Sequence, residues 1–193
     1  QHPYTKHLLN AEPKGNPDQT DPHSAIIRRA ENLKTWFPIK KGFMRKTVDY
    51  IKAVDDISLT LREGHTLGVV GESGSGKTTL GLSLLRLISS KGRIVYLGKN
   101  IDSFSRKDMR PLRKEMQIVF QDPYGSLSPR LSIYHIVAEG LQAQEGDLTT
   151  QQKRERVARA LEEVEIDPAT MDRYPHEFSG GQRQLIAMAR AIV

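Results

Sequence analysis

Gly71-Glu72-Ser73-Gly74-Ser75-Gly76-Lys77-Thr78 fits the phosphate-binding pattern G-x-x-x-x-G-K-[ST]. Residues 66–70 before it form a short apolar run that is typical of a buried strand. After it, apolar residues recur at the spacing of one helix face, at Leu80, Leu84, Leu87 and Ile88. A strand, a glycine-rich loop and a helix are the context that makes this pattern specific. We therefore expect a nucleoside triphosphate at this loop rather than a plain glycine turn.

The residue types of the loop suit the chemistry of a triphosphate. Glycines let successive backbone N–H groups turn inward to phosphate oxygens, and the following helix presents its positive end to the same anion. Lys77 is expected to reach the β- and γ-phosphates, and the Thr78 hydroxyl to ligate Mg²⁺. Thr79 is expected near the α-phosphate. The predicted nucleotide contacts are Gly71, Glu72, Ser73, Gly74, Ser75, Gly76, Lys77, Thr78 and Thr79.

Composition fits an ordinary water-exposed domain. The 193 residues carry a net charge of +6 and contain no cysteine, which excludes disulfides and thiolate metal sites in this sequence. No apolar stretch approaches the roughly 18 residues of a membrane span. Basic runs at 28–29, 40–41 and 45–46 could meet nucleic acid or anionic lipid, but we interpret them first as solvated loops. The chain begins at Gln1 and ends within a helical pattern, so we expect a fragment.

The sequence predicts a strand-rich part followed by a helical part. Residues 11–26 are rich in proline and poor in apolar residues, as in a linker. Strands are expected at 53–54, 57–61, 92–98 and 116–120. Helical faces follow at Ile133, Ile136, Val137 and Leu141, and at Val157, Leu161 and Val164. Asp167-Pro168 is expected to stop the second of these helices.

A second motif, Phe178-Ser179-Gly180-Gly181-Gln182, opens the last helical pattern. Ser179 and Gln182 have the spacing of a capping box, which by itself explains them. Two adjacent glycines do not fit that explanation, because each weakens a helix start by up to about 1 kcal/mol relative to alanine. They are understandable if a ligand approaches the backbone closely, which would make a second anion-binding helix N-terminus.

These motifs resemble the ATP-binding cassette (ABC) family. The phosphate loop matches its Walker A motif, residues 178–182 match its signature with Phe for the usual Leu, and Gln121 matches its Q-loop glutamine. The resemblance implies an α/β fold: a P-loop NTPase core with an antiparallel β subdomain and an inserted α-helical subdomain that carries the signature. It also implies that cassettes pair head to tail, with ATP between one Walker A and the partner's Ser179, Gly180, Gly181 and Gln182. Gln121, with Lys77, would be catalytic and would contact Mg²⁺ or position the attacking water. From the residues alone, Gln121 is an exposed polar residue at a strand end.

Finer resemblance indicates the peptide and nickel importer branch of this family. It rests on residues 37–42, 119–123, 126–127, 129–130 and 174–178. His2-Pro3-Tyr4-Thr5 resembles the carboxyl tail of an ATPase domain in that branch, although a disordered terminus is the alternative. The implied organisation is a preceding domain's tail at 1–10, a linker at 11–26, a partial ATP-binding core at 27–130 and a truncated helical signature subdomain at 131–193. This tandem arrangement is similar to the fused ATPase of a bacterial importer of peptides and microcin C.

An aromatic side chain is implied to stack on the adenine. Phe37 is our choice by its alignment with the family's aromatic-Pro pair, and Tyr50 is the alternative. Either residue could instead belong to the hydrophobic core.

The resemblance implies an ATPase that uses Mg²⁺ and ATP to import short peptides, microcin C-like substrates included. The implied partners are transmembrane permease subunits, a substrate-binding protein and a second ABC domain on the same chain, with no nucleic acid. The implied location is the cytoplasmic face of the plasma (inner) membrane. The Walker B aspartate, the catalytic glutamate and the switch histidine are expected beyond Val193, and His176 is not that histidine. The segment alone is therefore expected to fold poorly and to hydrolyse little ATP.

Two other functions are the alternatives. A soluble ABC protein that acts on nucleic acid or ribosomes would fit the basic balance of the chain. A nucleotide-binding module without turnover would follow if the expected glutamate were replaced.

Overall fold

The computed structural model describes residues 21–122, 125, 127–144 and 147–193. The expected domain tail at 1–10, most of the expected linker, and Pro123 and Ser126 of the importer-like stretch lie outside the described residues. The chain divides into two compact units. The first ends at Phe104 and the second begins at Ser105. The sequence predicted the change from core to helical subdomain at residue 131, and that division into domains stays a prediction.

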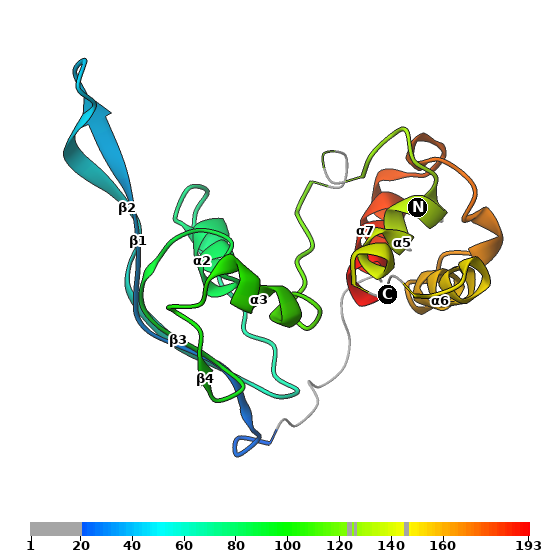
Figure 1. Cartoon of the computed structure of the whole chain (residues 1–193), viewed down its shortest axis with the longest axis horizontal. Helices are drawn as coiled ribbons and strands as arrows, with labels where there is room; N and C mark the ends of the chain where they lie inside the picture. Colours follow the sequence, from blue (N-terminus) through cyan, green and yellow to red (C-terminus); the bar gives the residue numbers. More distant parts are fainter. Residues whose placement is uncertain (1–20, 123–124, 126, 145–146) are drawn as a thin grey trace, which may run out of the picture. The chain divides into compact units, whose positions relative to one another are not determined.

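The first unit contains an antiparallel sheet of four strands (Figure 1). Its strands follow the order β2-β1-β3-β4, with β1 at Ile26–Lys41, β2 at Lys46–Arg62, β3 at Lys91–Tyr96 and β4 at Lys99–Asn100. β1 and β2 make a long hairpin that turns at residues 42–45. The expected strands at 53–54 and 57–61 are confirmed as parts of β2. The expected strand at 92–98 is confirmed as β3 up to Tyr96, whereas residues 97–98 form a turn.

Helix α2, Lys77–Leu84, follows the glycine loop and packs on this hairpin through polar side chains. Ser83 is fully buried, and its Oγ lies 2.7 Å from Thr35 Oγ1. The buried guanidinium of Arg28 donates a hydrogen bond to the Leu84 carbonyl oxygen, 2.9 Å away, and so satisfies one of the free carbonyls at the helix end. Two residues of β1 therefore make the polar contacts that position α2.

Two expected strands, 66–70 and 116–120, are not strands in the structure, and those predictions were wrong. Val70 is 97% exposed. A strand needs a hydrogen-bonding neighbour, and the apolar composition of both segments suits a parallel sheet buried on both faces. No described segment pairs with either of them, and the sheet that does form is entirely antiparallel.

The expected helix face after the loop is also only partly correct. α2 ends at Leu84, and Arg86 takes a positive φ of 55° just beyond it. Leu87 is 45% exposed instead of packed. The leucines of this pattern would cover a parallel sheet, and without one the short helix buries Ser83 instead.

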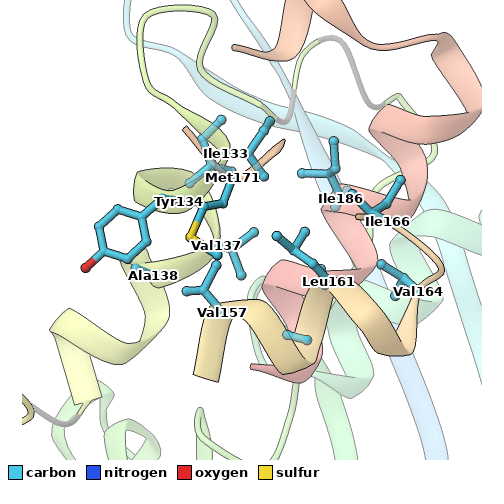
Figure 2. Packing of buried hydrophobic residues seen from close by; sticks show 14 of the residues in the cluster. Ile133, Tyr134, Val137, Ala138, Val157, Leu161, Val164, Ile166, Met171 and Ile186 are labelled. Carbon is cyan, nitrogen blue, oxygen red and sulfur yellow. The ribbon is translucent and has the colours of Figure 1, made fainter. Parts of the chain in front are cut away.

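The second unit is helical. It contains α3 at Arg106–Leu112, α5 at Ile133–Gln144, α6 at Thr150–Glu163 and α7 at Gly180–Ile192, with short 3₁₀ turns at Pro168–Thr170 and Pro175–Glu177. One hydrophobic core joins α5, α6 and α7 (Figure 2). Both expected apolar faces are buried in it, which confirms them. α6 ends at Glu163, before Asp167-Pro168, and Asp167 instead caps the first 3₁₀ turn by accepting a 2.9 Å hydrogen bond from Ala169 N.

No helix among the described residues is both long and apolar enough to cross a membrane.

Candidate nucleotide-binding site

The glycine loop reaches α2 through two residues with left-handed backbone angles. Gly74 has a φ of 81° and Gly76, the N-cap of α2, a φ of 93°. A Cβ atom at Gly76 would overlap the carbonyl oxygen of Ala53 on β2. Position 76 therefore requires glycine on two grounds, its backbone angle and its contact with the hairpin.

Lys77 folds back over the loop that precedes it. Its Nζ donates hydrogen bonds to the carbonyl oxygens of Gly71, at 2.7 Å, and Glu72, at 2.6 Å, and lies 3.4 Å from Ser75 Oγ. The ammonium is thus held at the mouth of the loop by backbone carbonyls. Phosphate oxygens can replace these carbonyl oxygens as hydrogen-bond acceptors. The ammonium group is therefore placed where it can bind a phosphate.

The N-terminus of α2 opens into a cavity of about 270 Å³. No side chain of the described residues caps this end of the helix. The cavity is lined by Ala53, Val54, Asp55, Ile57, Val69, Val70, Ser75, Gly76, Lys77 and Leu80. Uncapped N–H groups, the positive end of the helix and a lysine make this a place for an anion. The part played by β2 residues such as Ala53 and Asp55 was missed in the sequence, since no local pattern brings them to the loop.

The aromatic candidates for base stacking lie on the β1–β2 hairpin. Tyr50 lines a separate cavity of about 560 Å³ beside Trp36, and the two ring centroids are 5.9 Å apart. Phe37 is not among the residues of that lining; it pairs with Ile51 in the sheet register and is 43% exposed. Neither Phe37 nor Tyr50 is in the core, and stacking on adenine stays a prediction for both.

Ser179 and Gln182 form the capping box that their spacing predicted. Ser179 Oγ accepts a hydrogen bond from Gln182 N at 3.3 Å, and Gln182 Oε1 accepts one from Ser179 N at 3.0 Å. Gly181 has an ordinary backbone conformation, and a Cβ atom there would meet nothing within 4 Å. Nothing within the described chain therefore requires a glycine at position 181.

Arg183 forms hydrogen bonds to the segment that precedes α7, the helix that begins within the signature motif and is called the signature helix below. The sequence did not indicate this role. The Arg183 Nε donates to the carbonyl oxygens of Pro175, at 2.8 Å, and Phe178, at 3.0 Å. Phe178 is buried in the helical core. The loop before α7 is thus fixed by one cation and one aromatic side chain.

Gln121 is exposed and belongs to the second unit, whereas the phosphate loop belongs to the first. It follows a segment without regular structure instead of the expected strand. Its catalytic and magnesium roles stay predictions.

Comparison with known proteins agrees with these features. A sequence model described as ABC transporter matches residues 54–193, so the chain belongs to the ABC transporter family. It is 61% identical over 193 residues to the peptidoglycan transport ATP-binding protein YejF of Agrobacterium fabrum, a match that covers 100% of the chain and 35% of that protein. It is 41% identical over 175 residues to the oligopeptide transport ATP-binding protein AppF of Bacillus subtilis, covering 90% of the chain and 53% of AppF. The chain thus spans about a third to a half of the length of these relatives.

Solved structures support the fold. cbiO1 of Clostridium perfringens, part of the ABC transporter complex cbiONQ, superposes with a TM-score of 0.69 at 30% identity, covering 86% of this chain and 61% of that one. The ATP-binding cassette MJ0796, in a dimeric post-hydrolysis state bound to ADP and phosphate, gives a TM-score of 0.73 at 24% identity, covering 86% and 68%. The expected mixed α/β cassette fold with an antiparallel β subdomain is confirmed.

Proposed function

We propose that this chain supplies the phosphate loop and the signature of an ABC ATPase that couples binding and hydrolysis of Mg²⁺-ATP to the uptake of peptides. The observation that carries the proposal is the geometry at α2, where Lys77 and an uncapped helix N-terminus meet at one cavity. Relatives named for peptidoglycan and oligopeptide transport, matched along 90% or more of the chain, support the class of solute.

The loop fits the phosphates of ATP. Gly76 lets the backbone pass close to Ala53, and no side chain of the described residues caps the first turn of α2, so its N–H groups are open to a ligand. Lys77 would exchange its two carbonyl partners for β- and γ-phosphate oxygens. This arrangement would neutralise the charge that develops on the γ-phosphate, which is the main catalytic requirement in phosphoryl transfer.

Mg²⁺ would be held by the Thr78 hydroxyl, by phosphate oxygens and, in the closed site, by Gln121. Among the described residues no group of three or more His, Cys, Asp or Glu side chains is placed to hold a metal ion. That fits a magnesium ion that keeps several waters and takes its other ligands from the substrate. The ion would supply charge neutralisation across the β- and γ-phosphates.

The signature would serve the ATP of a partner cassette. The open space beside Gly181 leaves room for a ligand to approach the backbone of α7, and Ser179 already lies at the helix N-terminus. We infer head-to-tail pairing with a second ABC domain, and we expect that domain to belong to the same protein. Transmembrane permease subunits, a substrate-binding protein and a position at the cytoplasmic face of the plasma membrane complete the proposal.

A peptide-uptake assay tests this function. A strain that lacks the gene, auxotrophic for one amino acid, is supplied with that amino acid only as a short peptide. The wild-type gene should restore growth, and Lys77→Ala should not, with ATP affinity lowered at least about tenfold by loss of a charged phosphate contact. Lys99→Ala, on the exposed strand β4, is the matched control and should behave like wild type. Peptide-dependent growth without the gene, together with an ATPase activity that RNA stimulates, would favour the nucleic-acid alternative instead.

A further inference from the structure

The turn of the β1–β2 hairpin carries a concentrated positive charge. Residues 40–46, here called the hairpin tip, include Lys40, Lys41, Arg45 and Lys46 and no acidic residue. The tip is closed by a turn in which Arg45 N donates to the Gly42 carbonyl oxygen at 3.0 Å. In the part of the chain that the structure describes, no ion pair joins these four cations to a carboxylate.

Two large apolar side chains lie between these cations. Phe43 is fully exposed and Met44 is 78% exposed, so that neither packs on any described part of the protein. Val48, on β2 just after the tip, is also more than half exposed. A water-exposed turn usually carries small or polar residues instead. Residues of this kind at a turn therefore point to a surface that buries them.

The tip stands clear of the rest of the sheet. β3 pairs with β1 only from Arg28 to Lys34, so beyond that point the hairpin has two strands (Figure 1). A two-stranded hairpin alone is marginally stable in water. A surface outside the protein that buries the apolar turn would stabilise the hairpin.

We propose that the hairpin tip docks on an anionic membrane surface, with Phe43 and Met44 in the headgroup region and the four cations on lipid phosphates. Aromatic and apolar side chains at the interface, ringed by Lys and Arg, combine the two attractions that hold peripheral proteins on anionic bilayers. Nucleic acid is less well matched, because single strands stack successive bases on aromatic platforms and the tip offers one ring at its turn. The inference goes beyond the proposed function, since it requires neither a permease nor ATP.

Vesicle co-sedimentation tests it directly. The protein is mixed with vesicles of phosphatidylcholine containing about 30% phosphatidylglycerol, and with vesicles of phosphatidylcholine alone. It should sediment with the anionic vesicles, and about 1 M salt should release most of it, because the Debye length then falls to about 3 Å. Equal partition into neutral vesicles, or no dependence on salt, would overturn the role given to the cations.

Two variants separate charge from apolar contact. Changing the four cations of the tip to Gln should lower the partition coefficient about a hundredfold or more, at roughly tenfold for each one to two charges removed. The matched control changes four exposed cations elsewhere to Gln, namely Lys99, Arg106, Lys107 and Arg130, and should lower it much less. Phe43→Ser with Met44→Ser should weaken binding about tenfold while the charge stays unchanged.

A site-specific probe keeps the proposal testable if a variant folds poorly. Because the chain has no cysteine, Phe43→Cys labelled with a polarity-sensitive fluorophore reports the environment of the tip alone. Its emission should shift to the blue with anionic vesicles, whereas the same label at Leu97→Cys, exposed outside the hairpin, should not respond. A silent label at position 43, or a stronger response to poly-uridylate than to the vesicles, would overturn the proposal.

Discussion

The carbonyl oxygen of Ala53 occupies the place that a side chain on Gly76 would take. Gly76→Ala should therefore cost about 2–5 kcal/mol of unfolding free energy, from the left-handed backbone angle and from the forced shift of β2. ATP affinity should fall with it, because the first turn of α2 would move away from the loop. Urea unfolding and a titration with a fluorescent ATP analogue measure the two effects.

A matched control separates strain from collision. Gly64 also has a positive φ, 72°, but a Cβ atom there meets nothing within 4 Å. Gly64→Ala should cost only about 1–2 kcal/mol and leave ATP affinity unchanged. Equal losses for the two substitutions would contradict the role given to Ala53.

The buried hydroxyl pair of Thr35 and Ser83 couples α2 to the hairpin. Their oxygens are 2.7 Å apart, and Ser83 Oγ also donates to the Thr79 carbonyl oxygen at 2.7 Å. Thr35→Val, which keeps the shape, should cost about 1 kcal/mol, and Ser83→Ala about 1–3 kcal/mol. In a double-mutant cycle the two losses should fail to add by about 1 kcal/mol. Additive losses would mean that the pair does not hold the helix.

The local chemistry of the site could be predicted from sequence, whereas its surroundings could not. The loop, the capping box of Ser179 and Gln182 and the apolar faces of the helical unit follow from short-range patterns, and the structure has the last two as expected. The strands at 66–70 and 116–120 failed because strand formation depends on a partner far away in sequence. For the same reason the positions of Ala53 beside the loop and of Arg28 at the end of α2 left no local signal.

The sequence pattern also did not predict that a polar side chain of α2 is buried. A leucine pattern predicted which face of α2 is buried, yet Ser83 is the buried residue of that helix. A helix face is predicted from the spacing of apolar residues alone. That prediction fails where a polar side chain is buried because it hydrogen-bonds to another buried hydroxyl, such as that of Thr35.

Arg183 should control the order of the segment before the signature helix. Arg183→Lys loses the Nε donor that serves Pro175 and Phe178, and should cost the helical unit about 1–3 kcal/mol. Arg159→Lys, at an exposed position of α6, is the control and should change the unfolding free energy by less than about 0.5 kcal/mol. Hydrogen exchange of the Phe178 amide, which donates to the Pro175 carbonyl oxygen, reports the loop itself. Unchanged exchange in Arg183→Lys would show that the arginine does not order this loop.

The stability of the helical unit should fall in acid. Backbone N–H donation from Tyr174, with a further bond from Arg173, lowers the pKa of Glu177, and the Arg154 guanidinium lowers the pKa of Asp172. A carboxyl whose pKa is lower in the folded than in the unfolded state stabilises the fold above the unfolded value, about 4, and loses that contribution as the pH falls through the folded value.

Unfolding free energy measured between about pH 6 and pH 3 should therefore decline toward the acid end. The double variant Asp172→Asn with Glu177→Gln should be less stable at the upper end and should show a shallower decline, because it has no charge to lose at these two positions. The effect should be modest, since both pairs are solvent-exposed, and salt should weaken it further. A double variant with the same slope as wild type would assign the acid sensitivity to other carboxylates.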